Sequence, residues 1–229
     1  MFKILIRVRA GFHKKKRNTK DGGQATGQVV AATVKIEGVM VPVLNSDELY
    51  TQFKERLNSM AGECYRCKTA LEAGQLVARI LEEKKIQDLV LVESSLTKAA
   101  NLREALAGRD IRVYCENFRA KASEVGAGVT ELNWAIAELG TMVQIGVDVN
   151  QRLASMLPPI HVAFLQTSRL IPTLAETLKT IHSLPQIPGF VGFITGPSRT
   201  ADIERVLTIG VHGPEQFIAV FIDEEVGEA

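Results

Sequence analysis

The stretch Asp88-Leu-Val-Leu-Val-Glu93 decides the fold class, because its four consecutive apolar residues would make both faces of a strand apolar. Such a strand is typical of a parallel sheet that is covered on both faces. A helical pattern over residues 96–107 follows it, and a second short apolar run comes at residues 111–115. Strands that alternate with helices need crossover connections. We therefore predict an α/β protein with a mainly parallel open sheet and helices on both faces.

The same alternation extends outward from this stretch in both directions. On the N-terminal side, Ser46 can cap a helix whose apolar positions include Leu49, Phe53 and Leu57, and a second helix fits residues 70–83. On the C-terminal side, the pattern predicts helices at 171–182 and 201–208, and strands at 134–138, 142–146, 161–165, 190–194 and 217–222. The short gap after residue 138 indicates a hairpin or a sharp corner.

Residues 1–45 differ from the rest, so we divide the chain into a variable basic N-terminal extension, 1–45, and an α/β domain, 46–229. Residues 1–20 hold eight of the 27 Lys and Arg residues and no acidic residue, which leaves 19 basic and 26 acidic residues elsewhere. Residues 29–43 are rich in β-branched residues and predict strands with a turn at Glu37-Gly38. The basic arm is either a solvated terminus or a binder of nucleic acid or an acidic partner. Its scarcity of aromatic residues favours the first interpretation, and we do not expect nucleic-acid binding.

Composition also narrows the location and the cofactors. No apolar run reaches ~18 residues, and charges interrupt the apolar start, so neither a membrane span nor a signal peptide is predicted. Cys64 and Cys67 form a lone C-x-x-C, and Cys115 is the only other cysteine, so a zinc site or an iron–sulfur cluster lacks ligands. We expect a cytoplasmic protein with no bound metal or cofactor, and with both cysteines of the pair on or beside a buried strand.

The segment Thr195-Gly-Pro-Ser-Arg-Thr200 is the first candidate site. It lies between a predicted strand and the helix predicted at 201–208, whose first turn offers free N–H groups and the positive end of the helix dipole. The guanidinium of Arg199 suits a carboxylate or a phosphate. The alternative is that Ser198 or Thr200 only caps the helix and that Arg199 pairs with a surface acid. The predicted anion-binding residues here are Thr195, Gly196, Ser198, Arg199, Thr200 and Asp202.

Two titratable residues are candidates for catalysis. Glu138 ends a predicted buried strand, where an unpaired carboxylate is costly, so it could act as a base or a nucleophile. Its neighbours Gly140 and Thr141 are assigned to the substrate site. His212, in the loop Gly210-Val-His-Gly-Pro214, could transfer protons near neutral pH, and His161 is a weaker candidate. The alternatives are a structural carboxylate that accepts backbone N–H groups and a solvated loop histidine.

Taken in order, these motifs resemble the lactate-utilisation (LUD) domain family, most closely its lactate utilisation protein C type. The resemblance covers about residues 45–223 and implies a fold like that of ribose-phosphate isomerases and coenzyme A transferases. The region around Glu138 resembles the region that contains the catalytic glutamate in the related transferases. The matching segments are Gly128-Val-Thr130, Ala135–Thr141, Arg152, Ser155–Pro158, Ile171-Pro172, Thr195–Glu204 and Gly210–Pro214.

The resemblance also implies a function. It implies a subunit of a cytoplasmic system that oxidises L-lactate to pyruvate, in which partner subunits carry the iron–sulfur clusters. The present chain would bind a small anion at Thr195–Thr200 and carry no redox cluster. The alternative is a stand-alone enzyme that acts on a sugar phosphate or an acyl thioester, with Glu138 as base or nucleophile. Motifs of the commonest ATPases, dinucleotide enzymes and zinc proteases do not occur in the sequence.

Overall fold

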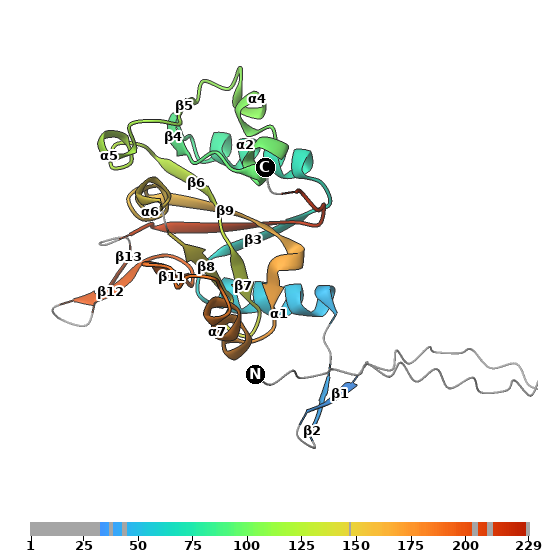
Figure 1. Ribbon diagram of the computed structural model, residues 1–229. Helices are drawn as coiled ribbons and strands as arrows, with labels where there is room; N and C mark the ends of the chain where they lie inside the picture. Colours follow the sequence, from blue (N-terminus) through green and yellow to red (C-terminus); the bar gives the residue numbers. More distant parts are fainter. Residues whose placement is uncertain are drawn as a thin grey trace, which may run out of the picture.

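A six-stranded sheet in which every pair of strands is parallel forms the centre of the protein (Figure 1). This computed structural model describes residues 33–36, 39–42, 45–146, 148–202, 206–209 and 213–227. The strand order is β3-β14-β9-β6-β4-β5, which confirms the predicted α/β class with a mainly parallel sheet. The strands are β3 (Glu63–Cys67), β4 (Asp88–Leu91), β5 (Arg112–Tyr114), β6 (Ala127–Glu131), β9 (Ile160–Gln166) and β14 (Gln216–Ile222).

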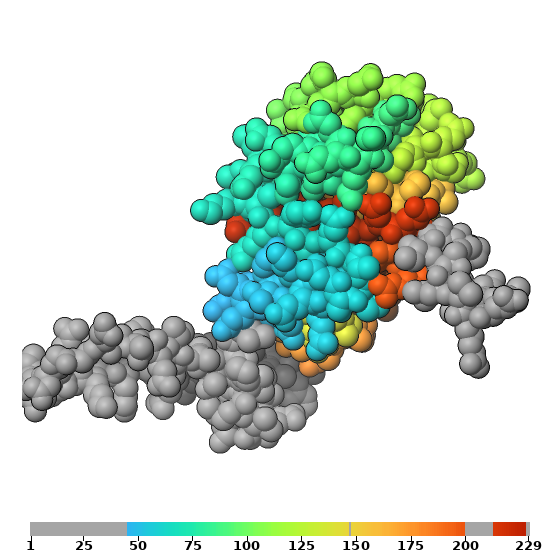
Figure 2. All heavy atoms as spheres, turned by 180° about the vertical axis from the view of Figure 1, so that it is seen from behind, coloured from blue at the N-terminus to red at the C-terminus, as the bar shows by residue number. Residues whose placement is uncertain are grey.

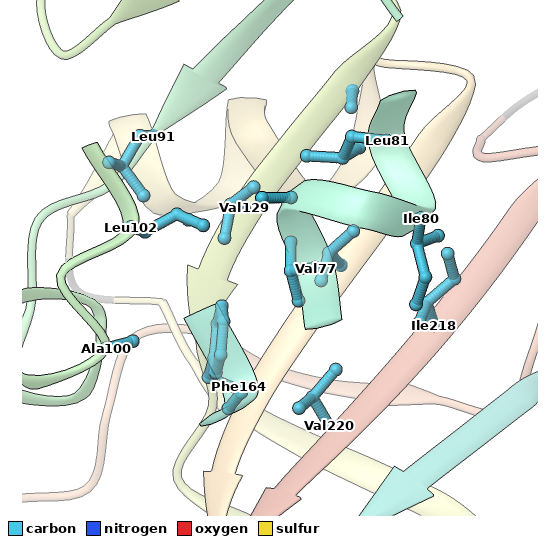
Figure 3. Packing of buried hydrophobic residues seen from close by; sticks show 14 of the residues in the cluster. Val77, Ile80, Leu81, Leu91, Ala100, Leu102, Val129, Phe164, Ile218 and Val220 are labelled. Carbon is cyan, nitrogen blue, oxygen red and sulfur yellow. The ribbon is translucent and has the colours of Figure 1, made fainter. Parts of the chain in front are cut away.

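Helices cover both faces of this sheet, as predicted. The first face carries α2 (Ala70–Glu83), α3 (Ser95–Ala99) and α4 (Leu102–Leu106), and the second carries α1 (Ser46–Ser59), α5 (Phe118–Lys121) and α6 (Val149–Met156). Side chains alternate along each strand, so that Phe164 of β9 belongs to the core cluster that includes Val77 of α2 (Figure 3), while Leu165 belongs to the cluster with α1 on the other face. Figure 2 shows from behind that α1, in blue, and the green segment around α4 lie at opposite ends of the molecule.

A smaller mixed sheet packs against the second face. Its order is β10-β7-β8-β11, formed by β10 (Leu170–Ile171), β7 (Trp134–Ile136), β8 (Thr141–Ile145) and β11 (Val191–Ile194). The predicted hairpin is confirmed, because β7 and β8 pair antiparallel with Trp134 opposite Val143. Met142 joins the core shared with α1, whereas Val143 faces Ile181 of α7 (Leu174–His182). A 3-10 turn, η1 (Thr167–Arg169), connects β9 to this sheet.

The prediction of a helix at residues 201–208 is wrong. An antiparallel pair of strands, β12 (Arg199–Asp202) and β13 (Val206–Ile209), occupies that position, with Thr200 opposite Thr208. The β-branched residues of this segment favour an extended backbone, which the prediction underestimated. The helix predicted at residues 96–107 is also interrupted, since Asn101 adopts a left-handed conformation with φ 50° between α3 and α4.

The N-terminal strands predicted within residues 29–43 are confirmed as an antiparallel pair, β1 (Thr33–Ile36) and β2 (Val39–Pro42). The basic arm, residues 1–20, lies outside the described residues, and the domain boundary at residue 45 stays a prediction. Asn45, and not the predicted Ser46, caps α1, of which Ser46 is the first residue. The side chain of Asn45 accepts backbone hydrogen bonds, and the carboxylate of Glu48 accepts one from the N–H of Asn45. This capping box fixes where the helix begins.

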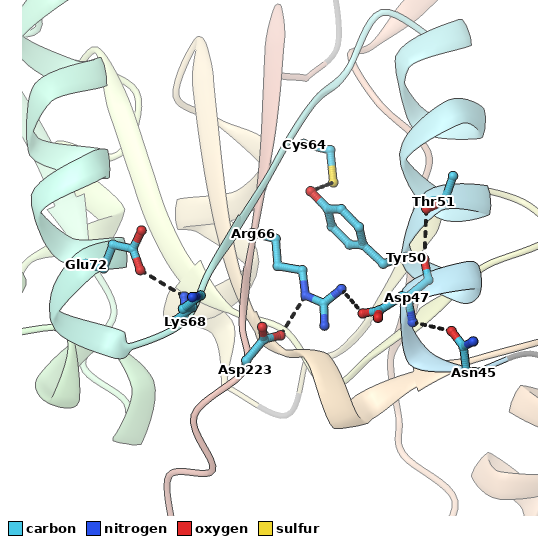
Figure 4. Close-up of polar contacts among 9 residues, drawn as sticks. All are labelled: Asn45, Asp47, Tyr50, Thr51, Cys64, Arg66, Lys68, Glu72 and Asp223. Atoms are coloured by element: carbon cyan, nitrogen blue, oxygen red, sulfur yellow. Dashed lines mark hydrogen bonds and ion pairs between the residues drawn. The ribbon is translucent and has the colours of Figure 1, made fainter. Parts of the chain in front are cut away.

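Arg66 ties α1 to the edge of the six-stranded sheet (Figure 4). Its guanidinium lies 2.7 Å from Asp47 Oδ1 on α1 and 2.7 Å from Asp223 Oδ1 after β14. It also stacks on the ring of Tyr50, 5.2 Å from the ring centroid. The side chain of Asp47 is 79% exposed, so water screens that ion pair and its contribution is small. The cluster therefore orients α1 more than it stabilises it.

Phe164 provides a test of the core between the sheet and α2. Its side chain is fully buried, so we expect Phe164→Ala to lower the free energy of unfolding by about 3–5 kcal/mol through lost contacts and a residual cavity. Phe193→Ala is the control, because Phe193 is 45% exposed and its loss should cost much less. Urea denaturation of the three proteins measures the difference, and equal losses for both variants would contradict this core assignment.

Candidate functional site

A cavity of about 360 Å³ lies where the small sheet meets α6 and the start of β14. Gln144 of β8 and Ser155 of α6 form polar parts of its wall. Phe190, Phe193 and Phe217 supply apolar walls. The predicted loop Thr195–Ser198 forms another side, with Gly213 and Pro214 beside it. Concave sites of this size, with mostly apolar walls and a few polar groups, are typical of small-molecule binding.

The structure brings together four of the predicted site residues, which come from two separate motifs. Thr141 Oγ1 and Thr195 Oγ1 are 2.6 Å apart and share a hydrogen bond. The backbone N–H of Ser198 donates to Pro214 O at 2.8 Å, which ties the loop to the segment before β14. Gly196 has φ +85°, and a Cβ there would lie 2.9 Å from the backbone oxygen of Met60. The loop is therefore shaped by contacts on three sides.

Other predicted residues of the loop are placed differently from the prediction. Arg199 is exposed and starts β12, and Thr200 and Asp202 belong to the same strand. Since a strand stands where the helix was expected, the first turn of a helix cannot form this anion site. His212 lies outside the described residues, so its role stays a prediction.

The contacts of Glu138 and Gly140 are those of residues that hold the fold together. Glu138 Oε1 accepts a hydrogen bond of 2.6 Å from the backbone N–H of Leu174, the first residue of α7. A carboxylate at the start of a helix is favourable, and Glu138 is not among the residues that line the cavity. Gly140 has φ +62°, and a Cβ there would lie 2.4 Å from Leu57 N of α1. The structure favours the structural interpretation of Glu138, and the catalytic role stays a prediction.

Two buried polar side chains of the cavity wall were not predicted. Gln144 is 1% exposed and Ser155 is 3% exposed. Ser155 Oγ donates to Gln144 Oε1 at 3.0 Å, and Gln144 Nε2 donates to the backbone oxygen of Gln151 at 3.3 Å. The sequence signals were a glutamine inside the apolar run Met142-Val-Gln-Ile145 and the place of Ser155 in a segment that carries the family resemblance. Buried polar groups need hydrogen-bond partners, and each of these two side chains provides one for the other.

His161 lies behind the cavity wall and is fully buried. Its Nε2 is 2.8 Å from Thr130 Oγ1, and its ring packs against Phe217, which lines the cavity, with 5.3 Å between ring centroids. Its Nδ1 has no hydrogen-bond partner among the residues that the structure describes. Burial lowers the pKa of His161 to about 3, because the charged imidazolium would lose its hydration. His161 is therefore a neutral group near the site, not a proton carrier at pH 7.

Arg152 is a source of positive charge beside the cavity. Its guanidinium lies over the ring of Phe190, 5.2 Å from the centroid; Phe190 lines the cavity, whereas Arg152 itself lies behind this ring and is not among the lining residues. Within the described segments, no acidic side chain forms an ion pair with Arg152. The family resemblance includes Arg152 and Ser155 without giving either of them a role. A stacked arginine without a carboxylate partner is suited to hold an anionic ligand.

The cysteine pair lies on β3, which confirms its placement on a buried strand. Cys64 packs in the core with α1 and Cys67 in the core with α2, so the two thiols lie on opposite faces of the sheet. Burial raises the pKa of each thiol to about 11. In the part of the chain that the structure describes, no group of three or more His, Cys, Asp or Glu is placed to hold a metal ion. None of the described helices is long and apolar enough to cross a membrane.

Fold and cavity together define an α/β protein in which a parallel sheet, covered on both faces, meets a small mixed sheet at a pocket with mostly apolar walls and a few polar groups. Residues 50–222 match the family described as LUD domain, so the chain belongs to the LUD domain family. The resemblance predicted from the motifs is therefore confirmed.

Curated relatives and a solved structure agree with this assignment. The chain is 26% identical over 201 residues to "Lactate utilization protein C" of Halalkalibacterium halodurans, covering 84% of this chain and 86% of that protein. It is 26% identical to the uncharacterized protein YkgG of Escherichia coli, covering 69% and 74% of the two chains. The crystal structure of a DUF162 family protein from Deinococcus radiodurans has a TM-score of 0.55 and 18% identity, and covers 79% of this chain and 99% of that one. This last similarity concerns the fold alone.

The burial of His161 predicts a pH dependence of stability. Because its pKa is lowered to about 3 in the folded state, from about 6.5 in the unfolded chain, only the unfolded state takes up a proton between these values. The stability contributed by the neutral imidazole is complete above pH 6.5 and falls as the pH is lowered, by about 1.4 kcal/mol per pH unit. Urea denaturation at pH 7.5, 6 and 5 should show this slope in the wild type and a shallower slope in His161→Gln. The exposed His182→Gln is the control. Identical slopes for His161→Gln and the wild type would refute the assignment.

Proposed function

We propose that this chain is a subunit of a cytoplasmic system that oxidises L-lactate, and that it binds a small anion in the cavity beside Thr195–Thr200. The observation that carries the proposal is the cavity itself, which joins the predicted loop to two buried polar side chains and lies beside an arginine. Membership of the LUD domain family and the name of the relatives, lactate utilization protein C, support the role in lactate utilisation.

The anion would be held by the loop and by Arg152. The hydroxyl groups of Thr195 and Ser198 and the backbone N–H of Gly196 offer hydrogen-bond donors at the cavity wall, whereas Pro197 has no N–H and that of Ser198 already donates to Pro214 O. No helix begins at this loop, so Arg152 supplies the positive charge that the helix dipole was predicted to supply. Stacking on Phe190 limits the positions that the guanidinium can take, which lowers the entropy lost on binding.

Iron–sulfur subunits are proposed as the partners. Oxidation of a hydroxy acid needs an electron acceptor, and the paired cysteines of this chain face opposite sides of the sheet, so they do not converge on one iron. This geometry supports a system in which partner subunits carry the clusters. The stand-alone enzyme with Glu138 as base or nucleophile gains no support, because Glu138 accepts a hydrogen bond from the start of α7.

The proposal is tested in the native host. We expect a strain that lacks this chain to fail to grow on L-lactate but to grow on pyruvate. We also expect the tagged chain, purified from lactate-grown cells, to bring down proteins that contain iron–sulfur clusters. A chain that is recovered alone and is dispensable for growth on lactate would contradict the proposal.

Arg152→Met tests the source of the charge. The variant keeps an unbranched side chain over Phe190 but removes the guanidinium, so we expect the affinity for L-lactate to fall at least about tenfold, the effect of one charge-assisted hydrogen bond. Titration calorimetry measures it. Arg103→Met is the control, because Arg103 is exposed and pairs with Glu93 away from the cavity. Unchanged affinity in a folded Arg152→Met protein would remove Arg152 from the site.

A further inference from the structure

We infer that Gln144 and Ser155 recognise an alcohol, so that the cavity selects a small hydroxycarboxylate over the corresponding oxo acid and over the acid without a hydroxyl group. This inference rests on the proposed function and deepens it, because it names the chemical group that the site reads. It follows from the directions of the hydrogen bonds that these two side chains already make.

The orientation of the Gln144 amide is fixed by its neighbours. The backbone oxygen of Gln151, 3.3 Å away, can only accept a hydrogen bond, so the nitrogen Nε2 of Gln144 must face it. The oxygen Oε1 then faces Ser155 Oγ at 3.0 Å. The single hydroxyl hydrogen of Ser155 donates to this oxygen or to the backbone oxygen of Arg152, 3.1 Å from Oγ, so it is used within the protein in either case. A flipped amide would place two oxygens against each other at Gln151.

Within the described part of the chain, these bonds leave one donor and one acceptor of the pair without a partner. Gln144 Nε2 carries a second hydrogen, and Ser155 Oγ keeps lone pairs after its hydrogen is donated. Both residues line the cavity and are almost fully buried, so bulk water does not satisfy these groups freely. A ligand with an alcohol can accept from Gln144 and donate to Ser155 at the same time. A ketone oxygen can only accept, and a methylene group can do neither.

The position of this pair relative to Arg152 sets the second group of the ligand. Arg152 lies one turn before Ser155 on α6, and its guanidinium stacks on Phe190, which lines the cavity together with Ser155. A guanidinium for a carboxylate is therefore placed behind an aromatic ring of the same cavity that holds the donor and acceptor for an alcohol. Phe193 and Phe217 offer apolar contact to a short hydrocarbon part.

The test compares three ligands of similar size on the purified full chain: L-lactate, pyruvate and propionate. Titration calorimetry, or ligand-detected NMR where the affinity is weak, gives each dissociation constant. We expect L-lactate to bind roughly tenfold more tightly than pyruvate and propionate, since a site that is built to pair with an alcohol leaves buried groups unpaired with the other two. Equal affinities for all three would overturn the inference and leave the proposed function standing. A chain that binds none of them would overturn both.

Ser155→Ala identifies the group that discriminates. We expect it to weaken L-lactate binding roughly tenfold and to leave propionate binding unchanged, so that the ratio of the two constants falls to about one. Gln144→Met is a second variant of similar length that also removes the pair, and Ser183→Ala, on an exposed serine at the end of α7, is the control. A ratio that stays at the wild-type value in a folded Ser155→Ala or Gln144→Met protein would overturn the inference.

Discussion

Burial of both faces of the six-stranded sheet is the constraint on which the rest of the structure depends. A strand covered on both sides must be apolar along its whole length, and β4, β9 and β14 nearly meet this requirement. Polar residues inside such a core need a partner or a purpose. Of the nine buried polar side chains among the described residues, four line the cavity or contact a residue that lines it, namely Thr141, Gln144, Ser155 and His161. Nearly half of the polar groups in the core are thus gathered around this cavity.

The small sheet determines where this place lies. The β7–β8 hairpin turns at Gly140, where only a glycine lets the chain approach the backbone of α1. The turn sets the register of β8, which brings Gln144 toward α6 and Thr141 to Thr195 beyond the end of β11. A segment after β11 and a helix before β9, far apart in the sequence, therefore share one cavity with the start of β14.

Much of the fold could be predicted from the sequence, because continuous apolar runs such as residues 88–93 and capped amphipathic helices such as α1 and α2 carry their own signal. The segment after Pro197 was predicted wrongly, since residues 201–208 fit a helical pattern and their antiparallel pairing became visible only in the structure. The loop Thr195–Ser198 was identified from its chemistry. Gln144 and Ser155 were missed, because a polar residue in a strand or a helix shows its burial only after the elements pack. Glu138 is a catalytic candidate in the sequence because nothing near it in the sequence pairs with its carboxylate. Its hydrogen-bond donor, the backbone N–H of Leu174, is 36 residues away and is brought to it only by the fold.

The central claim is that the cavity between Gln144, Ser155 and the loop Thr195–Ser198 is the ligand site of this LUD domain protein. The most direct measurement is a crystal structure of the chain with L-lactate. We expect density for the ligand in this cavity, with its hydroxyl group between Gln144 Nε2 and Ser155 Oγ and its carboxylate toward Arg152. A ligand bound elsewhere on the chain, with this cavity filled by water alone, would contradict it.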